Sequence, residues 1–375
     1  MINKPNNALT RVASGASYGA IAHDEHAAEA VHNAMAKMLP SKVGSVLLFL
    51  SSAYAHKPQR ALKLAAKAAG TPAVFGCCAM NLLTEQEWLM DVEGAVAMVF
   101  PNDLSLQPIN LLHQQGIDPS LVVTLTTPNA ANIAVNDVSS PQVGAITSDE
   151  YGHGPYAVWQ GGRVVEREFV QSALPNNLKS HVMVASGVRP ISPALCIDRS
   201  EAHKLMECDG TTAYHSLLGH LPANMHSLGL KNPYSLLCAV SENESPESLK
   251  LGHYKVHHIV SIDEEEQSVH LSGNPKHDRH MFWAVRDEQH AQEVMLDKLV
   301  KSKDSIDQAP VFALMFPNIS RGPEFYNGQD RDLELFQEVF PNTPLLGFYG
   351  NGEIAPGHRY GGLIHRYACV LGLYA

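Results

Sequence analysis

The sequence has no run of about 18 consecutive apolar residues, which is the length that a membrane-spanning helix needs. It also has no Lys/Arg-rich run, and its formal net charge is −11. Proteins that bind nucleic acid or anionic membranes usually carry a basic surface, so we expect neither partner. The first residues, Met1–Asn7, lack the apolar stretch of a secretory signal, and we therefore expect a cytoplasmic protein.

Cysteine is scarce and scattered: the chain has 6, and no two of them form a C-x-x-C pair. This pattern predicts neither a disulfide framework nor a structural zinc site. Histidine is abundant, with 20 residues, and one cluster comprises His253, His257, His258, His270, His277 and His280. An even spacing would place two of these histidines on one face of a strand, where zinc or iron needs a third ligand. A solvated, histidine-rich hairpin is the simpler explanation, and we favour it.

The length of 375 residues predicts two domains, because single hydrophobic cores stop growing at roughly 250–300 residues. Short apolar runs alternate with amphipathic helices, as in Ser45–Leu50, Pro58–Ala69 and Ala73–Phe75. We therefore predict an α/β (mixed α+β) fold of two layered domains, each a mixed sheet with packed helices. Two prolines within Arg189–Pro193 indicate a linker, so we place the domains at residues 1–195 and 196–375.

Other segments have distinct local patterns. Thr124–Ser140 is rich in Thr, Asn, Pro and Ser and predicts irregular structure. Tyr156–Glu168 alternates around two adjacent glycines and predicts a β-hairpin. Tyr254–Asp263 and Ser268–Leu271 predict a second hairpin across an acidic turn.

A short pattern occurs in both halves of the chain, at Thr71–Gly76 and Thr343–Gly347. In each, an apolar strand that follows a helix leads to a glycine turn, where a backbone can approach a bound molecule closely. A common connection used twice explains the similarity as readily as a shared binding role.

Two charged residues of the second half follow buried strands. We expect Val311–Phe316 and Leu345–Tyr349 to be parallel neighbours joined by a helix over Asp330–Phe340. Arg321 and Glu353 would then emerge at the same carboxyl edge of the sheet, where open α/β sheets bind ligands. The alternative is a surface ion pair that holds two loops together.

Three motifs suggest enzymes. Gly15–Gly19 fits the G-x-S-x-G pattern of a serine hydrolase, with Ser17 as nucleophile. Only one strand precedes this serine, whereas a nucleophile elbow stands at the centre of a parallel sheet. Cys77 or Cys78 would need a neighbouring cation to form a thiolate, and the sequence shows none. Gly350–Glu353 lacks the G-K-[ST] ending of a phosphate loop. We therefore expect a protein that is not an enzyme, with a hydrolase as the alternative.

Several motifs follow one another in order over about residues 10–375. The segment Pro344–Pro356, P-L-L-G-F-Y-G-N-G-E-I-A-P, and the later His365 resemble the signature and the trailing histidine of the C-terminal domain of the FIST family of signal-transduction proteins. Four further segments resemble family motifs: Phe312–Arg321, Lys204–Leu217, Gly76–Cys78 and Ser186–Pro190. Two cysteines of the family are absent, because Asn318 and Val188 stand in their places.

The resemblance implies a bacterial sensory protein that binds a small ligand and acts on a partner kinase or cyclase. One branch of the family senses nitric oxide through haem, and His153, between two glycines and near Trp159, is our candidate axial ligand. The glycine turns and charged residues give the candidate ligand site: Gly76, Cys77, Cys78, Arg189, Arg321, Gly352, Glu353 and His365. Because arginines suit a carboxylate and a glutamate suits an ammonium, an amino-acid-like zwitterion would satisfy this set.

Overall fold

The computed structural model describes residues 9–149, 152–174, 178–222, 225, 235–241, 246–250, 254–357 and 361–375. It confirms the predicted fold class, because helices pack on sheets that contain both parallel and antiparallel strands. The chain forms two compact units. The first comprises Met1–Ala185, Met295–Ile364 and Ala368–Ala375, and the second comprises Ser186–Val294 and His365–Tyr367.

This division differs from the segments 1–195 and 196–375. The chain leaves the first unit at Ser186, which is close to the predicted linker. The chain then returns to the first unit at Met295, because strands from both halves of the sequence pair in the same sheets. A single boundary along the sequence cannot describe such an arrangement.

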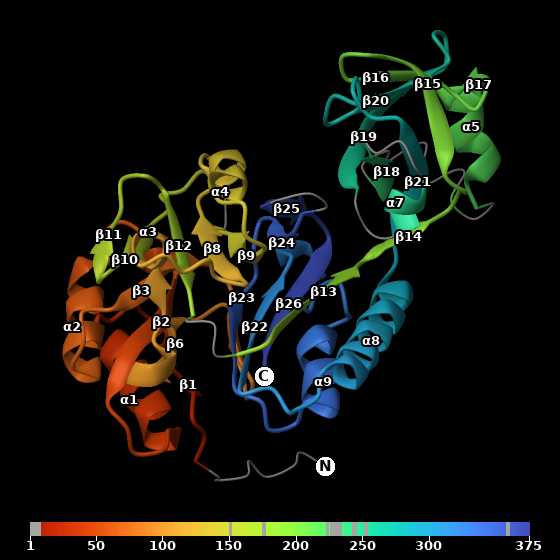
Figure 1. Cartoon of the computed structure of the whole chain (residues 1–375). Helices are drawn as coiled ribbons and strands as arrows, with labels where there is room; N and C mark the ends of the chain where they lie inside the picture. The colour runs from red at the N-terminus through yellow and green to blue at the C-terminus, as the bar shows by residue number, and fades with distance from the viewer. Residues whose placement is uncertain are drawn as a thin grey trace. The chain divides into compact units, whose positions relative to one another are not determined.

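Among its described residues, the first unit contains three six-stranded sheets, each built around two parallel strands joined by a helix (Figure 1). We refer to these strand–helix–strand segments as the first, second and third repeats. They are β2 (Val43–Ser51), α2 (Gln59–Ala69) and β3 (Val74–Ala79); β8 (Val122–Thr126), α4 (Ala131–Asp137) and β9 (Gln142–Ile146); and β22 (Phe312–Pro317), α9 (Arg331–Val339) and β23 (Leu345–Phe348). The sequence pattern shared by Thr71–Gly76 and Thr343–Gly347 is thus part of a structural repeat that has a third copy, at Pro141–Gly144.

Two antiparallel strands complete one side of each sheet, next to the first parallel strand. They are β6 (Glu93–Pro101) and β1 (Ala13–Gly19), β12 (Phe169–Ala173) and β7 (Gln107–Pro108), and β26 (Ala368–Tyr374) and β13 (Ser180–Ser186). The three sheets therefore share one strand order.

A hairpin completes the other side of each sheet, and it always comes from a different repeat. The first repeat continues into β4 (Leu82–Thr84) and β5 (Trp88–Leu89), which add to β23 of the third. The second continues into β10 (Val158–Gln160) and β11 (Arg163–Val164), which add to β3 of the first. The third continues into β24 (Glu353–Pro356) and β25 (Gly362–His365), which add to β9 of the second. The exchange is cyclic, so no repeat has a complete sheet without another.

Each repeat has a glycine at the same place in its second parallel strand: Gly76, Gly144 and Gly347. A Cβ atom at any of them would lie 1.7–1.8 Å from a main-chain carbonyl oxygen of the neighbouring strand, that of Leu48, Thr124 or Met315. These glycines are therefore required by close strand contact.

The core of the first unit lies between the sheets. Phe49 of the first sheet contacts Phe348 of the third, with ring centroids 4.8 Å apart, and Phe100 contacts Phe312 at 5.1 Å, both edge to face. Val143 of the second sheet belongs to the same buried cluster. Burial of these side chains from all three sheets supplies the main stabilisation.

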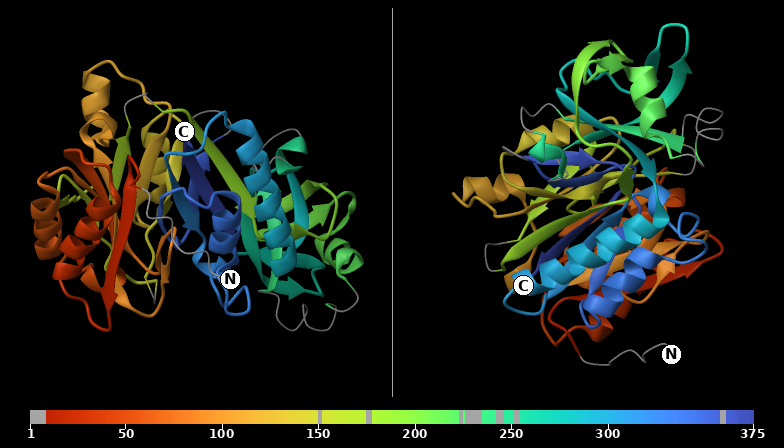
Figure 2. Two further views of the ribbon diagram at one scale, coloured as in Figure 1. Left: turned by 90° about the horizontal axis from the view of Figure 1, so that it is seen from below. Right: turned by 90° about the vertical axis from the view of Figure 1, so that its right-hand side faces the viewer.

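Helices α1 (Glu25–Lys37) and α2 cover the outer face of the first sheet, as Figure 1 shows. Alanines at helical spacing let α1 lie close to β1, and Gly15 of that strand faces the backbone of Ala34 directly. Figure 2 shows α9 alongside α8 (Glu288–Ser305), where Lys303 donates to the carbonyl of Val339 at 3.1 Å.

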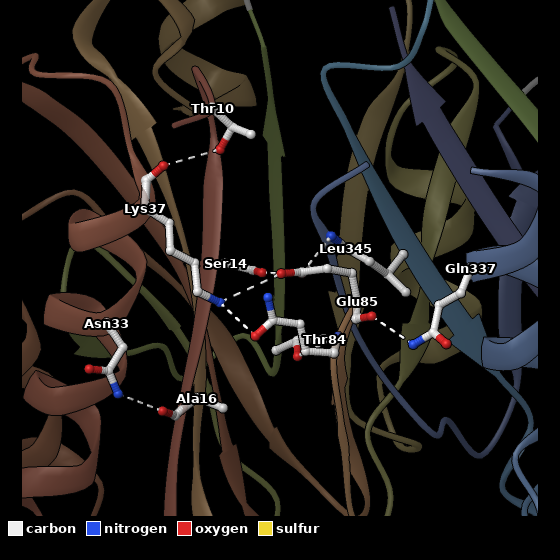
Figure 3. Close-up of polar contacts among 10 residues, drawn as sticks. Thr10, Ser14, Ala16, Asn33, Lys37, Thr84, Glu85, Gln337 and Leu345 are labelled. Atoms are coloured by element: carbon white, nitrogen blue, oxygen red, sulfur yellow. Dashed lines mark hydrogen bonds and ion pairs between the residues drawn. The ribbon is translucent and has the colours of Figure 1, made fainter. Parts of the chain in front are cut away.

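The β4–β5 hairpin is fastened by Glu85 in its turn (Figure 3). The Glu85 carboxylate accepts hydrogen bonds from Ser14 of β1 and from the backbone N–H of Leu345, the latter at 3.1 Å. Lys37 of α1 lies 3.7 Å from the same carboxylate, and Gln337 of α9 donates to the Glu85 carbonyl at 2.7 Å. Glu85 thus joins the first repeat to the third.

The described part of the second unit contains an eight-stranded sheet that closes on itself, because β21 pairs with both β15 and β18. Its strands are β14 (Val188–Pro190), β15 (Leu195–Glu201), β16 (Lys204–Cys208), β17 (Thr211–Thr212), β18 (Leu236–Ser241), β19 (Lys255–Asp263), β20 (Ser268–Leu271) and β21 (His280–Arg286). Trp283 lies in its core and donates to Ser216 of α5 (Ala213–His220) at 3.0 Å.

Both predicted hairpins are confirmed, as β10–β11 and β19–β20. The prediction of irregular structure over Thr124–Ser140 is wrong, because the segment holds the end of β8 and helix α4. Its polar residues are those of a repeat that packs fewer apolar side chains than the other two: Thr124 is buried and bonded to Gln142 at 2.7 Å.

Candidate functional site

The carboxyl ends of β22 and β23 meet in the third repeat. The two strands are parallel neighbours joined by α9, as predicted, and Asn318 and Gly350 form a further bridge beyond them. Arg321 follows β22 and Glu353 follows β23, so both lie just beyond these carboxyl ends. This is the edge at which open α/β sheets bind ligands.

Glu353 is fully buried at the start of β24, and the side-chain amide of Asn318 donates a 2.8 Å hydrogen bond to its Oε1. Asn318 is positioned by Ser320, whose backbone N–H and hydroxyl both donate to its Oδ1 at 3.1 and 2.6 Å. This local loop turns the amide nitrogen toward the carboxylate. Glu353 therefore has an oriented neutral donor at Oε1.

Arg321 is 1% exposed and forms two parallel hydrogen bonds with Asp332, which is equally buried: Nε to Oδ2 at 2.9 Å and Nη2 to Oδ1 at 2.8 Å. The hydroxyl of Tyr326 donates to the same Oδ1 at 3.0 Å. Burial lowers the pKa of Arg321, but the Asp332 carboxylate more than offsets this, so the pKa lies above its ordinary value. The guanidinium is thus permanently charged and committed to Asp332.

Asp330 begins α9 and caps it, because its Oδ1 accepts from the backbone N–H of Leu333 at 3.1 Å. Its Oδ2 accepts from the hydroxyl of Tyr349, which is also buried. Burial raises the pKa of Asp330 to about 6, and the nearby Asp332 carboxylate adds to the effect. Burial likewise raises the pKa of Tyr349, which stays protonated.

Comparison of the repeats shows that this ionic content is peculiar to the third. Glu353 stands opposite Ala145, one residue after the repeat glycine, and the equivalent positions hold Val158 and Leu82. Arg321 lies six residues after Met315, the residue of β22 that pairs with the repeat glycine Gly347. The residues at that place in the first and second repeats are Tyr54 and Ala130.

The positions equivalent to Asn318 also contact a glutamate in the other two repeats. Ser51 donates to Glu93 in the first, and Thr127 donates to Glu168 in the second at 3.4 Å. Both of these glutamates retain solvent exposure, whereas Glu353 has none. Of the positions compared, those in the first and second repeats hold neutral or solvent-exposed groups. Charged side chains are fully buried only at those of the third repeat.

Ser148, which follows β9, forms hydrogen bonds that connect the three repeats at this edge. Its hydroxyl accepts from the backbone N–H of Met80, after β3, and donates to the carbonyl of Tyr349 at 2.6 Å. The hydroxyl of the adjacent Thr147 is buried, with no hydrogen-bond partner among the described residues. Ends of all three parallel pairs thus contribute to the surroundings of the third-repeat residues.

The first group of sequence-predicted site residues, Gly76, Cys77 and Cys78, lies within β3 and is buried. Burial raises the pKa of both thiols, so neither is a thiolate at neutral pH. Gly352 precedes β24 with φ +147°, a conformation that favours glycine and that delivers Glu353 to its buried position.

Two predicted residues belong to the second unit. Arg189 of β14 pairs with Asp287, Nε to Oδ2 at 2.7 Å. His365 is buried at the end of β25 and is grouped with the second unit. The structure brings Arg321, Gly352 and Glu353 together in the third repeat, and the binding role of the full predicted set remains a prediction.

His153 is exposed, and its backbone N–H donates to Asp149 at 3.1 Å in a surface turn. An exposed imidazole lacks the apolar surroundings that a haem needs, so this residue does not fit an axial ligand. Of the histidine cluster, His253 lies outside the described residues. Within the described part of the chain, no group of three or more His, Cys, Asp and Glu side chains is arranged to hold a metal ion.

Ser17 lies inside β1, paired with Ala95, rather than at a strand-to-helix turn. Its hydroxyl donates to Glu29 at 2.6 Å and lies 2.8 Å from Nδ1 of His26, both on α1. The Gly15 and Gly19 of the motif accommodate this helix, since a Cβ at either would contact it. The motif is therefore a strand–helix contact in this fold.

Sequence reasoning missed four buried residues near this edge: Asp332 and Tyr326, which contact Arg321, and Asp330 and Tyr349, which bond to each other. Asp330 and Asp332 open the helix that the sequence predicts, and two acids in a first helical turn are usual for capping alone. The signal that identifies them is their burial, which the sequence does not show.

Two family models match the chain. A family model described as the FIST N domain matches residues 44–211, and one described as the FIST C domain matches residues 212–356. No curated protein matches the chain. No helix among the described residues is both long and apolar enough to cross a membrane. FIST domains are signal-transduction domains thought to bind small ligands. The chain belongs to the FIST family of signal-transduction proteins.

Proposed function

We propose that this chain is a cytoplasmic sensor that binds a small ligand at the carboxyl edge of the third repeat and passes a conformational signal to a partner kinase or cyclase. One observation carries the proposal. The third repeat buries Glu353, Arg321 and Asp332 at an edge where the other repeats are neutral or solvated. Burying charge costs several kcal/mol per ion unless it is compensated, so a fold that does not need these groups retains them for another reason.

The arrangement supports a ligand with an ammonium group. The Arg321 charge is already neutralised by Asp332, so it favours no additional anion. Glu353 is a fully buried carboxylate whose Oε1 accepts from a neutral amide, and an ammonium group is a common partner of a carboxylate. An amino acid or a small primary amine has the required group. The ordered Asn318 loop holds the carboxylate in place before binding, which reduces the entropic cost of association.

The test is a thermal-shift screen with the common amino acids and small primary amines. A ligand that binds only the native state raises stability by about RT ln(1 + [L]/Kd), or roughly 2.7 kcal/mol at 100 times Kd. We expect Glu353→Gln to abolish the shift, because it keeps the side-chain volume and removes the charge. Glu168→Gln is the control, since this glutamate contacts Thr127, the second-repeat equivalent of Asn318, and is exposed. Full affinity in Glu353→Gln would overturn the proposed site.

We propose further that the chain is not an enzyme. The buried thiols of Cys77 and Cys78 are protonated, and Ser17 is held between β1 and α1. A broad esterase and amidase screen tests this: turnover that disappears in Ser17→Ala would contradict it. Haem is tested by absorbance, because a Soret band after haemin titration that is altered by nitric oxide would establish the haem alternative.

A further inference from the structure

Strand β13 lies at one edge of the third sheet, next to β26. The backbone N–H of Lys179 donates to the Ala375 carbonyl at 2.8 Å, and the N–H of Ala375 donates back at 2.9 Å. The N–H of Gly187 donates to the Tyr367 carbonyl at 2.7 Å. These contacts belong to one antiparallel register, in which every second residue of β13 directs its backbone groups toward β26. The residues whose backbone groups point away from β26 are therefore Ser180, Val182, Val184 and Ser186.

These outward backbone groups of β13 have no hydrogen-bond partner in the described part of the chain. Val182 and Val184 are partly exposed and pack at the border of the core between the sheets. Edge strands are usually protected by charged side chains, proline or a bulge, but residues 180–186 include no Lys, Arg, Asp, Glu or Pro. An unprotected edge of this kind is a template for pairing with another strand.

The strands at the same place in the other two sheets are protected. β7 has two residues, and one of them is Pro108, which has no N–H to donate. β1 is covered by α1 and the residues after it: Asn33 donates to the Ala16 carbonyl at 2.8 Å, and the N–H of Leu39 donates to the Thr10 carbonyl at 2.7 Å. β13 is seven residues long, and it is the member of this set that lacks such protection among the described residues.

The sequence of β13 suits pairing with a second copy of itself. It reads S-H-V-M-V-A-S, which is nearly the same in both directions about Met183. In an antiparallel pair with a twofold axis at Met183, Val182 of one copy stands opposite Val184 of the other, and Ser180 stands opposite Ser186. These four residues are the ones whose backbone groups point outward, so each N–H and C=O meets a partner. The partly exposed valines of one copy then cover those of the other.

We propose that this chain forms a homodimer in which β13 pairs antiparallel with β13 of a second copy, about a twofold axis at Met183. The interface is isologous, because the same strand contributes from both copies. It joins two six-stranded sheets into one continuous sheet. The proposal rests on the strand edge alone and does not depend on the ligand site proposed above.

Sedimentation equilibrium of the full chain, over a wide range of protein concentration, tests the dimer. Val184→Pro removes one outward N–H per copy and keeps the hydrogen bonds to β26, because an edge strand tolerates proline where its N–H faces outward. We expect the dimer Kd to rise by about 100-fold or more, since each copy loses a backbone donor and leaves a carbonyl of the other unsatisfied.

Val164→Pro on the edge strand β11 is the matched control. The N–H of Val165 donates to the Val158 carbonyl at 3.0 Å, so the N–H of the preceding Val164 faces away from β10. The control therefore makes the same substitution at an outward N–H of another sheet edge, and we expect it to leave the dimer Kd unchanged.

Disulfide cross-linking gives a readout that does not require the proline variant to fold. At the proposed axis the two copies of residue 183 form a non-hydrogen-bonded pair, whose Cα atoms lie about 4.5 Å apart, within the range of a disulfide. Met183→Cys should therefore cross-link on mild oxidation, in a Cys196→Ser background that removes the exposed thiol. Ser180→Cys in the same background should not, because its two copies are six residues out of register, or about 20 Å apart.

Three outcomes would each overturn the proposal. One is a wild-type protein that stays monomeric at every concentration. Another is a dimer whose Kd is the same in the wild type and in Val184→Pro. The third is cross-linking of Ser180→Cys that is as efficient as that of Met183→Cys.

Discussion

The side-chain amide of Asn318 donates to the Glu353 carboxylate across 2.8 Å, and both residues are buried. The equivalent places in the first sheet hold Ser51 and Val158, which fill the same positions without a buried charge. We therefore expect the double variant Asn318→Ser/Glu353→Val to fold with at least the stability of the wild type, and to lose the ligand response.

Glu353→Val alone separates the two roles, because it leaves the Asn318 amide without this acceptor. An unsatisfied buried donor costs about 1–3 kcal/mol, so the single variant should be less stable than the double variant by that amount. Urea denaturation of the three proteins measures the difference. If the double variant were the less stable one, the carboxylate would be a structural requirement and the argument from repeat equivalence would fail.

The Arg321–Asp332 pair should be strongly coupled. Asp332→Leu leaves a buried guanidinium without its counter-ion, and we expect a loss of about 3–5 kcal/mol. Arg321→Met/Asp332→Leu removes both charges and should cost less than the sum of the single variants. A double-mutant cycle in urea gives the coupling energy, and a coupling below about 0.5 kcal/mol would contradict a compensated buried pair.

Asp330 should make stability depend on pH. Its folded-state pKa is about 6, against an ordinary value of 3.8, so the folded protein holds this proton more tightly than the unfolded chain does. The stabilisation from this group is complete below 3.8 and is lost as the pH rises to about 6. The full change is on the order of 3 kcal/mol.

Asp330→Asn tests that sign, because asparagine also caps a helix and does not ionise. Unfolding free energies of the two proteins, measured in urea between pH 4 and 8, should diverge in favour of the variant as the pH rises and become parallel above about 6. A difference that stays constant across this range would show that Asp330 does not titrate there.

The third repeat is the part of the fold that the sequence predicts best. The apolar strands β22 and β23, the helix between them and the glycine turn are all local patterns, and they place Arg321 and Glu353 near the same edge. The partners of these residues could not be predicted, because tertiary packing brings them together and leaves no local sequence pattern. From the sequence alone, Asp332 resembles any acidic residue at a helix start, and Asn318 is only a departure from a family motif.

The cyclic hairpin exchange could not be predicted in this way. β24 pairs with β9 and β4 pairs with β23, and both pairings join distant parts of the chain. The hydrophobic periodicity of a strand predicts which of its faces is buried, but it does not predict which strand pairs with it. The division of the chain at residue 195 assumed that neighbours in sequence share a sheet, and the exchange removes that assumption.

Glu85 should contribute to stability beyond the value of a surface ion pair. Its carboxylate accepts from Ser14 of the first sheet and from the Leu345 backbone N–H of the third repeat, so Glu85→Ala leaves both donors without this acceptor. We expect a loss of about 1–3 kcal/mol. Gln86→Ala, on the same turn and exposed, is the control and should change stability by less than about 0.5 kcal/mol. Equal effects of the two variants would reduce Glu85 to a surface residue.

The last prediction concerns the stability of variants at the three repeat glycines. Alanine at Gly76, Gly144 or Gly347 would place its Cβ within 1.7–1.8 Å of a main-chain oxygen in the adjacent strand, so the parallel pair must separate. Overpacking of this kind usually costs about 1–3 kcal/mol, and a clash with backbone cannot be relieved by a rotamer change, so we expect at least about 3 kcal/mol at each position. Gly219→Ala is the control: Gly219 lies in α5 with no atom within 4 Å of the Cβ position, and alanine there should stabilise by about 0.5–1 kcal/mol. Thermal denaturation of the four variants compares them directly. Similar losses at Gly76, Gly144 and Gly347 would follow from the shared strand geometry, whereas tolerance at one of them would mean that its repeat can open its parallel pair at little cost.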